Sequence, residues 1–212
     1  MARKAGEGVG DVNFDRASAI QAAKAADLAY RAPTVRAGST AAFVEYDAPS
    51  GTLTLAIAGT DDMTDLLADL RAIPAPVGWK LGHGVSLHAG FVEQQERLHA
   101  ALCRELKKYP PPSRIVAGGH SLGAAMMALT VARIPGYFLH AEVYLFGCPK
   151  IGDKEWADHF RVLTHGCAVF RVEGAQDWIP RFPMAPLWHH VGTWQDGGPV
   201  GHSLAGYIAA LS

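Results

Sequence analysis

A serine flanked by glycines is the first feature of this sequence that suggests chemistry. The segment Gly119-His120-Ser121-Leu122-Gly123 has the pattern G-x-S-x-G, which occurs by chance in roughly one chain in ten of such composition. Its setting is more specific, because Arg114-Ile115-Val116-Ala117 predicts a strand before it and the segment 124–128 predicts a helix after it. A serine on such a tight turn is strained and presents its hydroxyl as a nucleophile. The alternative is an ordinary strand-to-helix junction whose glycines serve only packing.

A neutral serine needs a general base, usually a histidine. His202 follows the glycine-rich stretch 197–201, which is predicted to be flexible, and opens the last predicted helix, so we predict that it is the base. His159 lies inside a predicted helix and His140 precedes a strand, and we predict structural roles for both. The histidines that follow Ser121 in the sequence are His140, His159, His165, His189, His190 and His202.

The third catalytic group should be a carboxylate between the serine and the base, since serine hydrolases of this pattern have the order Ser, Asp or Glu, His. Asp177 lies just after the predicted strand 169–172, where such a carboxylate belongs, and we predict that it is the acid. Asp153 and Asp196 are the competing candidates. Asp153 is better explained as the N-cap of the helix that begins at Lys154.

Two backbone groups are candidates for an oxyanion hole. The N–H of Leu122 stands at the start of a helix, where a developing negative charge is stabilised. Thr60 ends the segment 56–60 after an earlier predicted strand and offers both an N–H and a hydroxyl. The alternative is that Thr60 or Asp61 only caps the next helix.

A helix is predicted over 62–73 from the spacing of its apolar residues. Leu66 and Leu67 are candidate substrate-binding residues if this helix forms an apolar flap, together with the residues up to Trp79. The same pattern also describes a helix packed on the core, and the two interpretations stay open.

The elements that must position these groups alternate between strands and helices. Strands are predicted at 41–46, 52–58, 114–117, 142–146 and 168–172, and further helices at 15–30, 91–108, 122–133, 154–162 and 202–211. This alternation predicts a mostly parallel sheet between two layers of helices. The first two strands, joined by the turn 47–51, are predicted to form an antiparallel hairpin at one edge. We expect one domain over 1–212, with 1–13 as a flexible N-terminus.

Composition limits the other possibilities. Apolar residues make up 49% and charged residues 18%, as in ordinary globular proteins. The formal net charge of −1 gives no reason to expect a nucleic-acid partner. The widely spaced Cys103, Cys148 and Cys167 favour neither disulfides nor a zinc site, and we predict that all three are buried.

Nothing in the sequence predicts a membrane span, since it contains no run of about 18 apolar residues. The polar segment 1–13 has no apolar core like that of a signal peptide. We therefore expect a cytoplasmic protein, or a secreted one if an export signal is absent from this sequence.

Taken together, these segments resemble the class 3 lipases, which are α/β hydrolases of the fungal-lipase type. The segments that carry the resemblance are 54–60, Leu87-His88-Ala89-Gly90-Phe91 (V-H-x-G-F in the family), 119–123 (G-H-S-L-G), 146–152 (F-G-x-P-R-V-G), 176–183 (N-D-x-V-P-x-L-P), 188–192 (Y-x-H-V-G) and the helix with His202, Leu204 and Tyr207. The resemblance runs in order from about 41 to 211. It implies an α/β-hydrolase fold, Ser121 as nucleophile, Asp177 as acid, His202 as base, and Thr60 with Leu122 as oxyanion donors.

The function predicted from the resemblance is hydrolysis of acylglycerols or other acyl esters through an acyl-enzyme, without a metal or organic cofactor. The partner is then a small-molecule or lipid ester, with contact to a lipid interface. Two features depart from the family: 63–70 has no aromatic residue, and the gap between Asp177 and His202 is short. A short-chain esterase, an acyltransferase and a non-catalytic binding protein of the same fold remain the alternatives.

Overall fold

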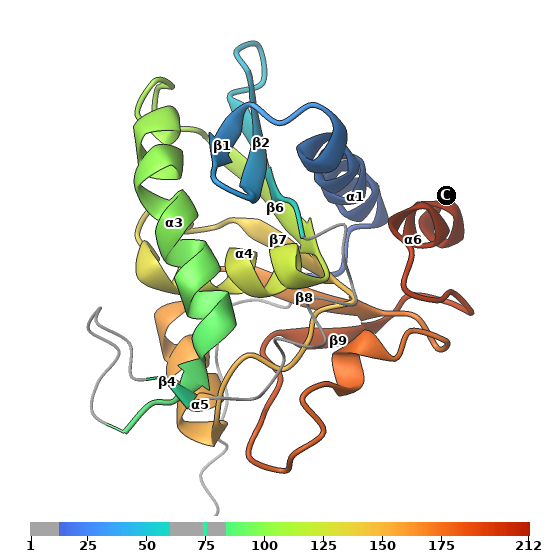
Figure 1. Cartoon of the computed structure of the whole chain (residues 1–212). Coiled ribbons are helices and arrows are strands. Elements are labelled where there is room, and N and C mark those ends of the chain that lie inside the picture. The colour runs from blue at the N-terminus through green and yellow to red at the C-terminus, as the bar shows by residue number, and fades with distance from the viewer. Residues whose placement is uncertain (1–12, 60–73, 76–83) are drawn as a thin grey trace, which may run out of the picture.

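The fold is described from a computed structural model of residues 13–59, 74–75 and 84–212 (Figure 1). A seven-stranded sheet forms its middle layer. In spatial order its strands are β1 (Val35–Ala37), β2 (Thr40–Asp47), β3 (Thr52–Ile57), β6 (Arg114–His120), β7 (Glu142–Phe146), β8 (Ala168–Glu173) and β9 (Thr193–Asp196). The pairs β1–β2 and β2–β3 are antiparallel, and the other four pairs are parallel.

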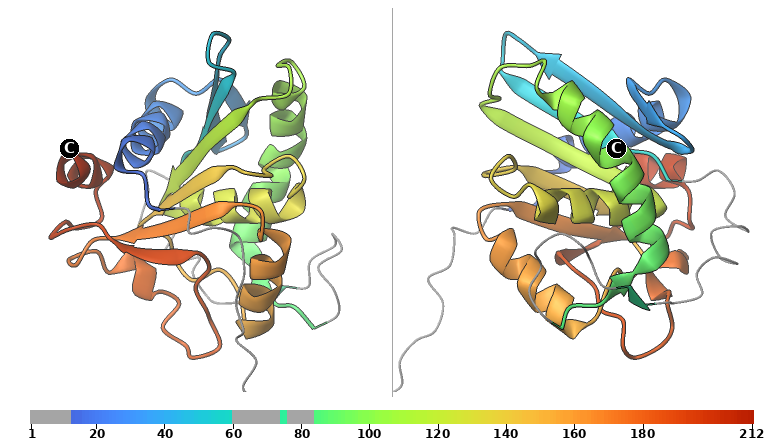
Figure 2. Two further views of the ribbon diagram at one scale, coloured as in Figure 1. Left: turned by 180° about the vertical axis from the view of Figure 1, so that it is seen from behind. Right: turned by 60° about the vertical axis from the view of Figure 1, so that its left-hand side comes forward.

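Helices cover both faces of this sheet, as Figures 1 and 2 show. One face carries α1 (Arg16–Arg31) and α6 (Leu204–Leu211), and the other carries α3 (Ala89–Leu106), α4 (Leu122–Arg133) and α5 (Lys154–Leu163). The smaller elements are a 3-10 helix, η1 (Ile179–Arg181), and a two-stranded ribbon of β4 (Pro74–Ala75) and β5 (Leu87–His88). The predicted three-layer architecture with a mostly parallel sheet is therefore confirmed.

Small side chains bring the helices close to β6, the strand that precedes Ser121. Asp15 caps α1 by accepting from the N–H groups of Ala17 and Ser18. The buried face of α1 is made of alanines, and a Cβ placed on Gly118 of β6 would lie 3.0 Å from the Cβ of Ala22. On the other face α4 is buried along nearly its whole length, as expected for the helix at the centre of that layer.

The sheet differs from the prediction in its edges and in one strand length. The short strands β1 and β9 were not predicted, since three or four residues with exposed positions give no clear periodicity. Because β1 lies outside β2, the predicted hairpin is not itself at the edge. The strand before the serine runs on to His120, since Gly118 and Gly119 keep pairing with β7.

Three further predictions had different outcomes. Of the cysteines only Cys148 is buried, whereas Cys103 and Cys167 are partly exposed, because both lie beside hollows in the surface. The predicted helix 62–73 and most of the N-terminal segment 1–13 lie outside the described residues. Among the described helices, none is long and apolar enough to cross a membrane.

Candidate active site

Ser121 lies on a strained turn between β6 and α4. Its φ of 60° and ψ of −127° place a residue with a side chain in a region that normally favours glycine. A Cβ on Gly119 would lie 2.4 Å from the carbonyl oxygen of Gly123, and one on Gly123 would lie 2.1 Å from that of Ile57. Only glycine fits at either position, so both glycines are needed for this turn to form against β3 and α4.

Asp177 and His202 are joined by a hydrogen bond although 25 residues separate them. Nδ1 of His202 lies 2.8 Å from Oδ2 and 2.9 Å from Oδ1 of Asp177. The aspartate side chain is fully buried and that of the histidine is 10% exposed. A buried carboxylate at this nitrogen fixes the proton on Nδ1, which leaves Nε2 able to accept a proton.

The carboxylate of Asp177 receives two further hydrogen bonds. The N–H of Ile179 donates to Oδ1 at 3.0 Å, and the hydroxyl of Tyr207 donates to Oδ2 at 2.7 Å. Burial by itself raises the pKa of Asp177, but the hydrogen bonds from His202 and Tyr207 outweigh it, so the pKa lies below the usual value. The acid is therefore held in its charged form.

Backbone hydrogen bonds tie the loop of the acid to the loop of the base. Ala175 donates to the carbonyl of Gly198 at 2.9 Å, and Gln176 donates to that of Val200 at 3.1 Å. Gly197 donates to the carbonyl of Glu173 at 2.8 Å. The stretch 197–201, expected to be flexible, is in this way fixed along the loop after β8.

The ends of four neighbouring parallel strands, β6 to β9, bring the three predicted catalytic residues to one edge of the sheet: Ser121 follows β6, Asp177 follows β8 and His202 follows β9. The N–H of Ser121, after β6, donates to the carbonyl of Phe146 at the end of β7. A Cβ on the next residue, Gly147, would lie 2.5 Å from Oδ2 of Asp177 and 3.0 Å from the ring of His202. The rings of His120 and His202 stack with their centroids 4.5 Å apart. Nε2 of His202 is buried and has no hydrogen-bond partner among the described residues.

His120, the residue before the serine, forms one wall of the site. The pKa of His120 is lowered to about 3, mainly by burial. The nearby His202 also lowers this pKa, and Asp177 raises it by a smaller amount. The ring is therefore neutral near pH 7 and adds no positive charge beside the base. The hydroxyl of Tyr30 lies 3.4 Å from Nδ1 of His120. These contacts, and the hydrogen bond from Tyr207 to Asp177, could not be predicted from the sequence, because they join residues that are distant in the chain.

One of the two predicted oxyanion donors lies within the described residues. Leu122 begins α4, so its N–H is among the first amides of the helix, which have no acceptor within the helix. Thr60 lies outside the described residues, as do the candidate substrate-binding residues Leu66 and Leu67. Gly59, just before Thr60, lies against the turn of the serine, because a Cβ on it would be 2.9 Å from the carbonyl oxygen of His120.

The competing candidates for the catalytic acid and base make other contacts. Asp153 caps α5 by accepting from the N–H of Trp156 at 2.8 Å, as predicted. Asp196 ends β9 and accepts from the N–H of Gly198. His159 lies within α5, and His140 is exposed with a φ of 65°. Within the described part of the chain, no group of three or more His, Cys, Asp or Glu side chains is arranged to hold a metal ion.

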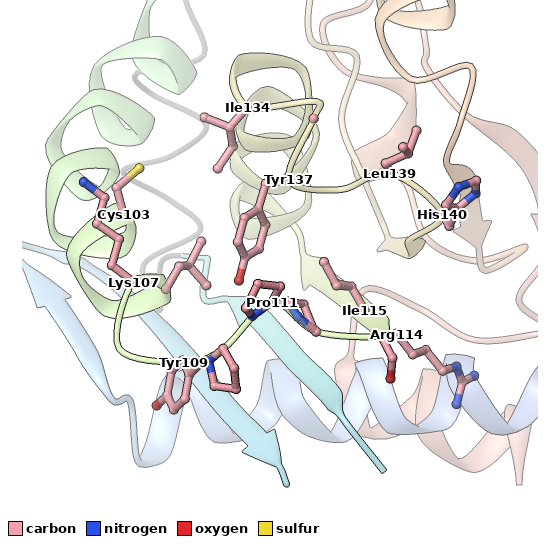
Figure 3. Close-up of a pocket in the computed structure, with 15 residues that line it drawn as sticks. Cys103, Lys107, Tyr109, Pro111, Arg114, Ile115, Ile134, Tyr137, Leu139 and His140 are labelled. Carbon is pink, nitrogen blue, oxygen red and sulfur yellow. The ribbon is translucent and has the colours of Figure 1, made fainter.

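A hollow of about 540 Å³ lies at the opposite end of β6 from Ser121 (Figure 3). Arg114 and Ile115, at the start of the strand, line it together with Tyr137 and the end of α3. Ser121 follows the other end of the same strand, so this hollow takes no part in the arrangement around the serine.

Fungal lipases are among the solved structures that have the same architecture. A lipase of Rhizomucor miehei in complex with its propeptide is similar with a TM-score of 0.68 and 19% identity, over 90% of this chain and 77% of that one. A lipase from Rhizopus microsporus var. chinensis has a TM-score of 0.70 and 19% identity, over 85% and 73% of the two chains. At these identities the likeness shows the fold, which is the predicted α/β-hydrolase fold.

Sequence comparison identifies the family. The secreted mono- and diacylglycerol lipase 3 of Gibberella zeae is 30% identical over 132 residues, which are 58% of this chain and 41% of that protein. The phospholipase A1-IIbeta of Arabidopsis thaliana is 34% identical over 106 residues, 42% of this chain and 24% of that protein. The chain thus matches less than half the length of these relatives. The family model for lipase (class 3) matches residues 54–187, well over half of the chain. The chain therefore belongs to the class 3 lipase family.

Proposed function

We propose that this chain is a serine ester hydrolase in which Ser121, His202 and Asp177 form a catalytic triad. The observation that carries the proposal is the buried hydrogen bond between Asp177 and His202 beside the strained turn of Ser121. An imidazole oriented by a carboxylate, next to a serine on such a turn, is the arrangement that activates a hydroxyl for attack on a carbonyl.

The first half of the reaction forms an acyl-enzyme. Oγ of Ser121 attacks the acyl carbon of the ester while Nε2 of His202 takes the hydroxyl proton. The negative charge that develops on the carbonyl oxygen is stabilised by the N–H of Leu122 and by Thr60. The tetrahedral intermediate collapses, the bond to the alcohol oxygen breaks, and His202 returns the proton to the leaving alcohol.

Water completes the cycle by the same steps. His202 takes a proton from a water molecule, whose oxygen attacks the acyl carbon. Collapse of the second intermediate breaks the bond to Oγ, and the serine regains its proton from His202. Asp177 stays charged throughout and stabilises the imidazolium that forms in each half.

The substrates that we propose are acylglycerols or other acyl esters. One relative is named a mono- and diacylglycerol lipase and another a phospholipase A1, which supports glycerol-based lipid esters. The fungal relatives are named as secreted, which supports secretion of this protein more than the cytoplasmic location that we considered first.

Turnover of p-nitrophenyl esters of increasing chain length, with and without an emulsion, tests this proposal. We expect hydrolysis by the wild-type chain and loss of it in Ser121→Ala. Ser113→Ala is the matched control, because Ser113 lies just before the other end of β6 and its hydroxyl donates to the carbonyls of Ser50 and Gly51 in the turn before β3. Activity that persists in Ser121→Ala contradicts the mechanism. Transfer of the acyl group to an added alcohol in preference to water favours an acyltransferase.

A further inference from the structure

The hollow at the start of β6 has the size and the wall of a ligand pocket. Its volume is about 540 Å³, and ligand pockets have volumes of roughly 300–1,000 Å³. The wall is mostly apolar and comes from the end of α3, the proline run 110–112 and the segment 134–139 after α4 (Figure 3). Because Ser121 follows the other end of the strand, the acyl group of the proposed substrate does not fill this hollow.

The formal charges in the wall of the hollow are basic. Lys107 and Arg114 carry them, and none of the described lining residues is a carboxylate. Arg114 already donates to Oε1 of Glu142 at 2.8 Å, and its side chain extends away from the hollow (Figure 3). Lys107, at the end of α3, is exposed and forms no ion pair with a described residue, and the nearby Glu105 pairs with Lys108. Lys107 is therefore the cation that this wall offers to a ligand, and it favours an anion.

A hydroxyl in the same wall lacks an acceptor. The ring of Tyr137 stands between the end of α3 and Leu139 (Figure 3). Its hydroxyl oxygen is buried and has no hydrogen-bond partner among the described residues. Burial raises the pKa of this hydroxyl, so it keeps its proton and is a donor. A buried donor without an acceptor costs free energy, and a ligand oxygen bound to it would remove that cost.

We propose that this hollow binds a fatty carboxylate, with its carboxylate between Lys107 and the hydroxyl of Tyr137 and its alkyl chain along Ile134 and Leu139. The anion would meet the unpaired cation and accept from the unpartnered hydroxyl, and the chain would cover exposed apolar surface. Ester hydrolysis releases a carboxylate of this kind, and in this respect the inference rests on the proposed function. The hollow is then a second site for the product, remote from Ser121.

An NMR titration that follows backbone amide shifts tests this second site. Full-length wild-type protein is titrated with dodecanoate below the concentration at which it forms micelles. We expect saturable shifts of the amides of Gly136, Tyr137 and Leu139, with one Kd that fits all three. The amide of Gly147, next to the ring of His202, reports separately on the candidate active site. Absence of saturable shifts at the three amides of the hollow overturns the proposal.

Lys107→Gln tests the contact with the carboxylate. It should weaken dodecanoate binding roughly fivefold, the effect of one exposed ion pair. Binding of dodecanol, which has the same chain without the charge, should not change. Arg104→Gln is the matched control, because Arg104 is an exposed cation of α3 that does not line the hollow. An unchanged Kd in Lys107→Gln, or an equal loss in Arg104→Gln, overturns the proposal.

Leu139→Ser tests the contact with the alkyl chain. It should weaken binding of both dodecanoate and dodecanol roughly fivefold, because the chain then covers less apolar surface. Leu139 is 54% exposed, so the substitution should leave the fold intact. Val162→Ser is the matched control, since Val162 is 66% exposed on α5 and does not line the hollow. Equal losses in the two variants overturn the proposal.

Tyr137→Phe tests the unpartnered hydroxyl. It should weaken dodecanoate binding roughly fivefold, and the ligand-free protein should be at least as stable to heat as the wild type, since a buried donor without an acceptor is removed. Tyr109→Phe is the control, because Tyr109 also lines the hollow but its hydroxyl already donates to Glu105. A lower Tm with an unchanged Kd in Tyr137→Phe shows that the hydroxyl serves the fold only and contradicts its contact with the ligand.

Ester hydrolysis separates this inference from the proposed function. Lys107→Gln should hydrolyse p-nitrophenyl butyrate as well as the wild type does, because Lys107 lies at the far end of β6 from Ser121. Dodecanoate binding in the hollow of a protein that hydrolyses no ester contradicts the proposed function alone. Ester hydrolysis without shifts at Gly136, Tyr137 and Leu139 contradicts the second site alone.

Discussion

The hydroxyl of Tyr207 connects the last helix to Asp177, since it lies 2.7 Å from Oδ2 of that residue. The same hydroxyl accepts from the backbone N–H of Gly174 at 2.9 Å. Tyr207 is fully buried, and burial, followed by the bond to Asp177, raises the pKa of its hydroxyl. Its proton is therefore retained for the carboxylate, which makes Tyr207 a positioning residue for the acid.

Removal of this hydroxyl in Tyr207→Phe should lower kcat/KM for a soluble ester by about ten- to a hundredfold. A hydrogen bond to a charged group contributes about 1.5–3 kcal/mol, and the charged form of Asp177 is what orients His202. Tyr109→Phe is the control, because it also removes a hydroxyl that donates to a carboxylate, that of Glu105, but on the surface. A drop of the same size in Tyr109→Phe would contradict the assignment.

The same substitution has a signature in stability. The pKa of Asp177 is lowered in the fold, so its contribution to stability is present above the unfolded pKa of about 4 and is lost as the pH falls through the folded value. Urea unfolding should therefore show that Tyr207→Phe is destabilised at pH 7 and that its difference from the wild type shrinks on acidification below about pH 4. A difference independent of pH indicates a packing role only.

Gly123→Ala should prevent the turn at the serine from forming. Its methyl group would overlap the backbone of Ile57 and Ala58, so β3 and α4 must separate, at a cost of about 1–3 kcal/mol or more. Gly136→Ala is the control, since a Cβ there meets nothing within 4 Å. Thermal unfolding and ester turnover measure both variants. Full activity in Gly123→Ala would show that the close approach is not needed.

The strained conformation of Ser121 is predicted to lower the stability of the fold. Both Ser121→Ala and Ser121→Gly remove the nucleophile, but glycine adopts a φ of 60° without the strain of a side chain. We expect Ser121→Gly to be more stable than Ser121→Ala by about 1 kcal/mol, within the range for such strain. Denaturant unfolding of the two variants decides this, and a less stable glycine variant would argue against a strained turn.

A buried histidine outside the candidate triad should make the protein sensitive to acid. His88 is buried against Phe91, neither ring nitrogen has a hydrogen-bond partner among the described residues, and burial lowers the pKa of the ring to about 4. The unfolded chain, with a pKa near 6.5, binds a proton first. The free energy of unfolding is therefore highest above about pH 6.5 and falls as the pH is lowered toward 4. At pH 5 it is lower by about 2 kcal/mol because of His88.

His88→Phe tests this dependence. Phenylalanine keeps a flat ring against Phe91 without the buried nitrogens, so the variant should lose about 2 kcal/mol less than the wild type between pH 7 and pH 5. His165→Phe, at an exposed position, serves as the control. If unfolding of His88→Phe follows the wild-type pH curve, the buried ring is not the source of the effect.

The architecture could be predicted from the sequence because its helices and longer strands have clear periodicity and caps. Asp153 at the start of α5 and the order of strands and helices are examples. The strands β1 and β9 could not be predicted, since short edge strands depend on the partner strand more than on their own residues. The single-domain prediction for 1–212 stays a prediction.

For the candidate site, residue types and chain order indicated Ser121, Asp177 and His202, whose roles stay proposals. The contacts that shape the site depend on tertiary structure. Tyr207 reaches Asp177 from α6, and the ring of His120 stacks on that of His202 from β6. No local spacing encodes such contacts, because each depends on how two distant segments pack.

Covalent labelling tests the central claim most directly. The protein is treated with a fluorophosphonate probe, which reacts with an activated serine, and the modified residue is located by peptide mass spectrometry. The account predicts one adduct, on Oγ of Ser121, that is lost in His202→Ala and strongly reduced in Asp177→Asn. An adduct on another residue, or labelling of Ser121 that does not depend on His202, would contradict it.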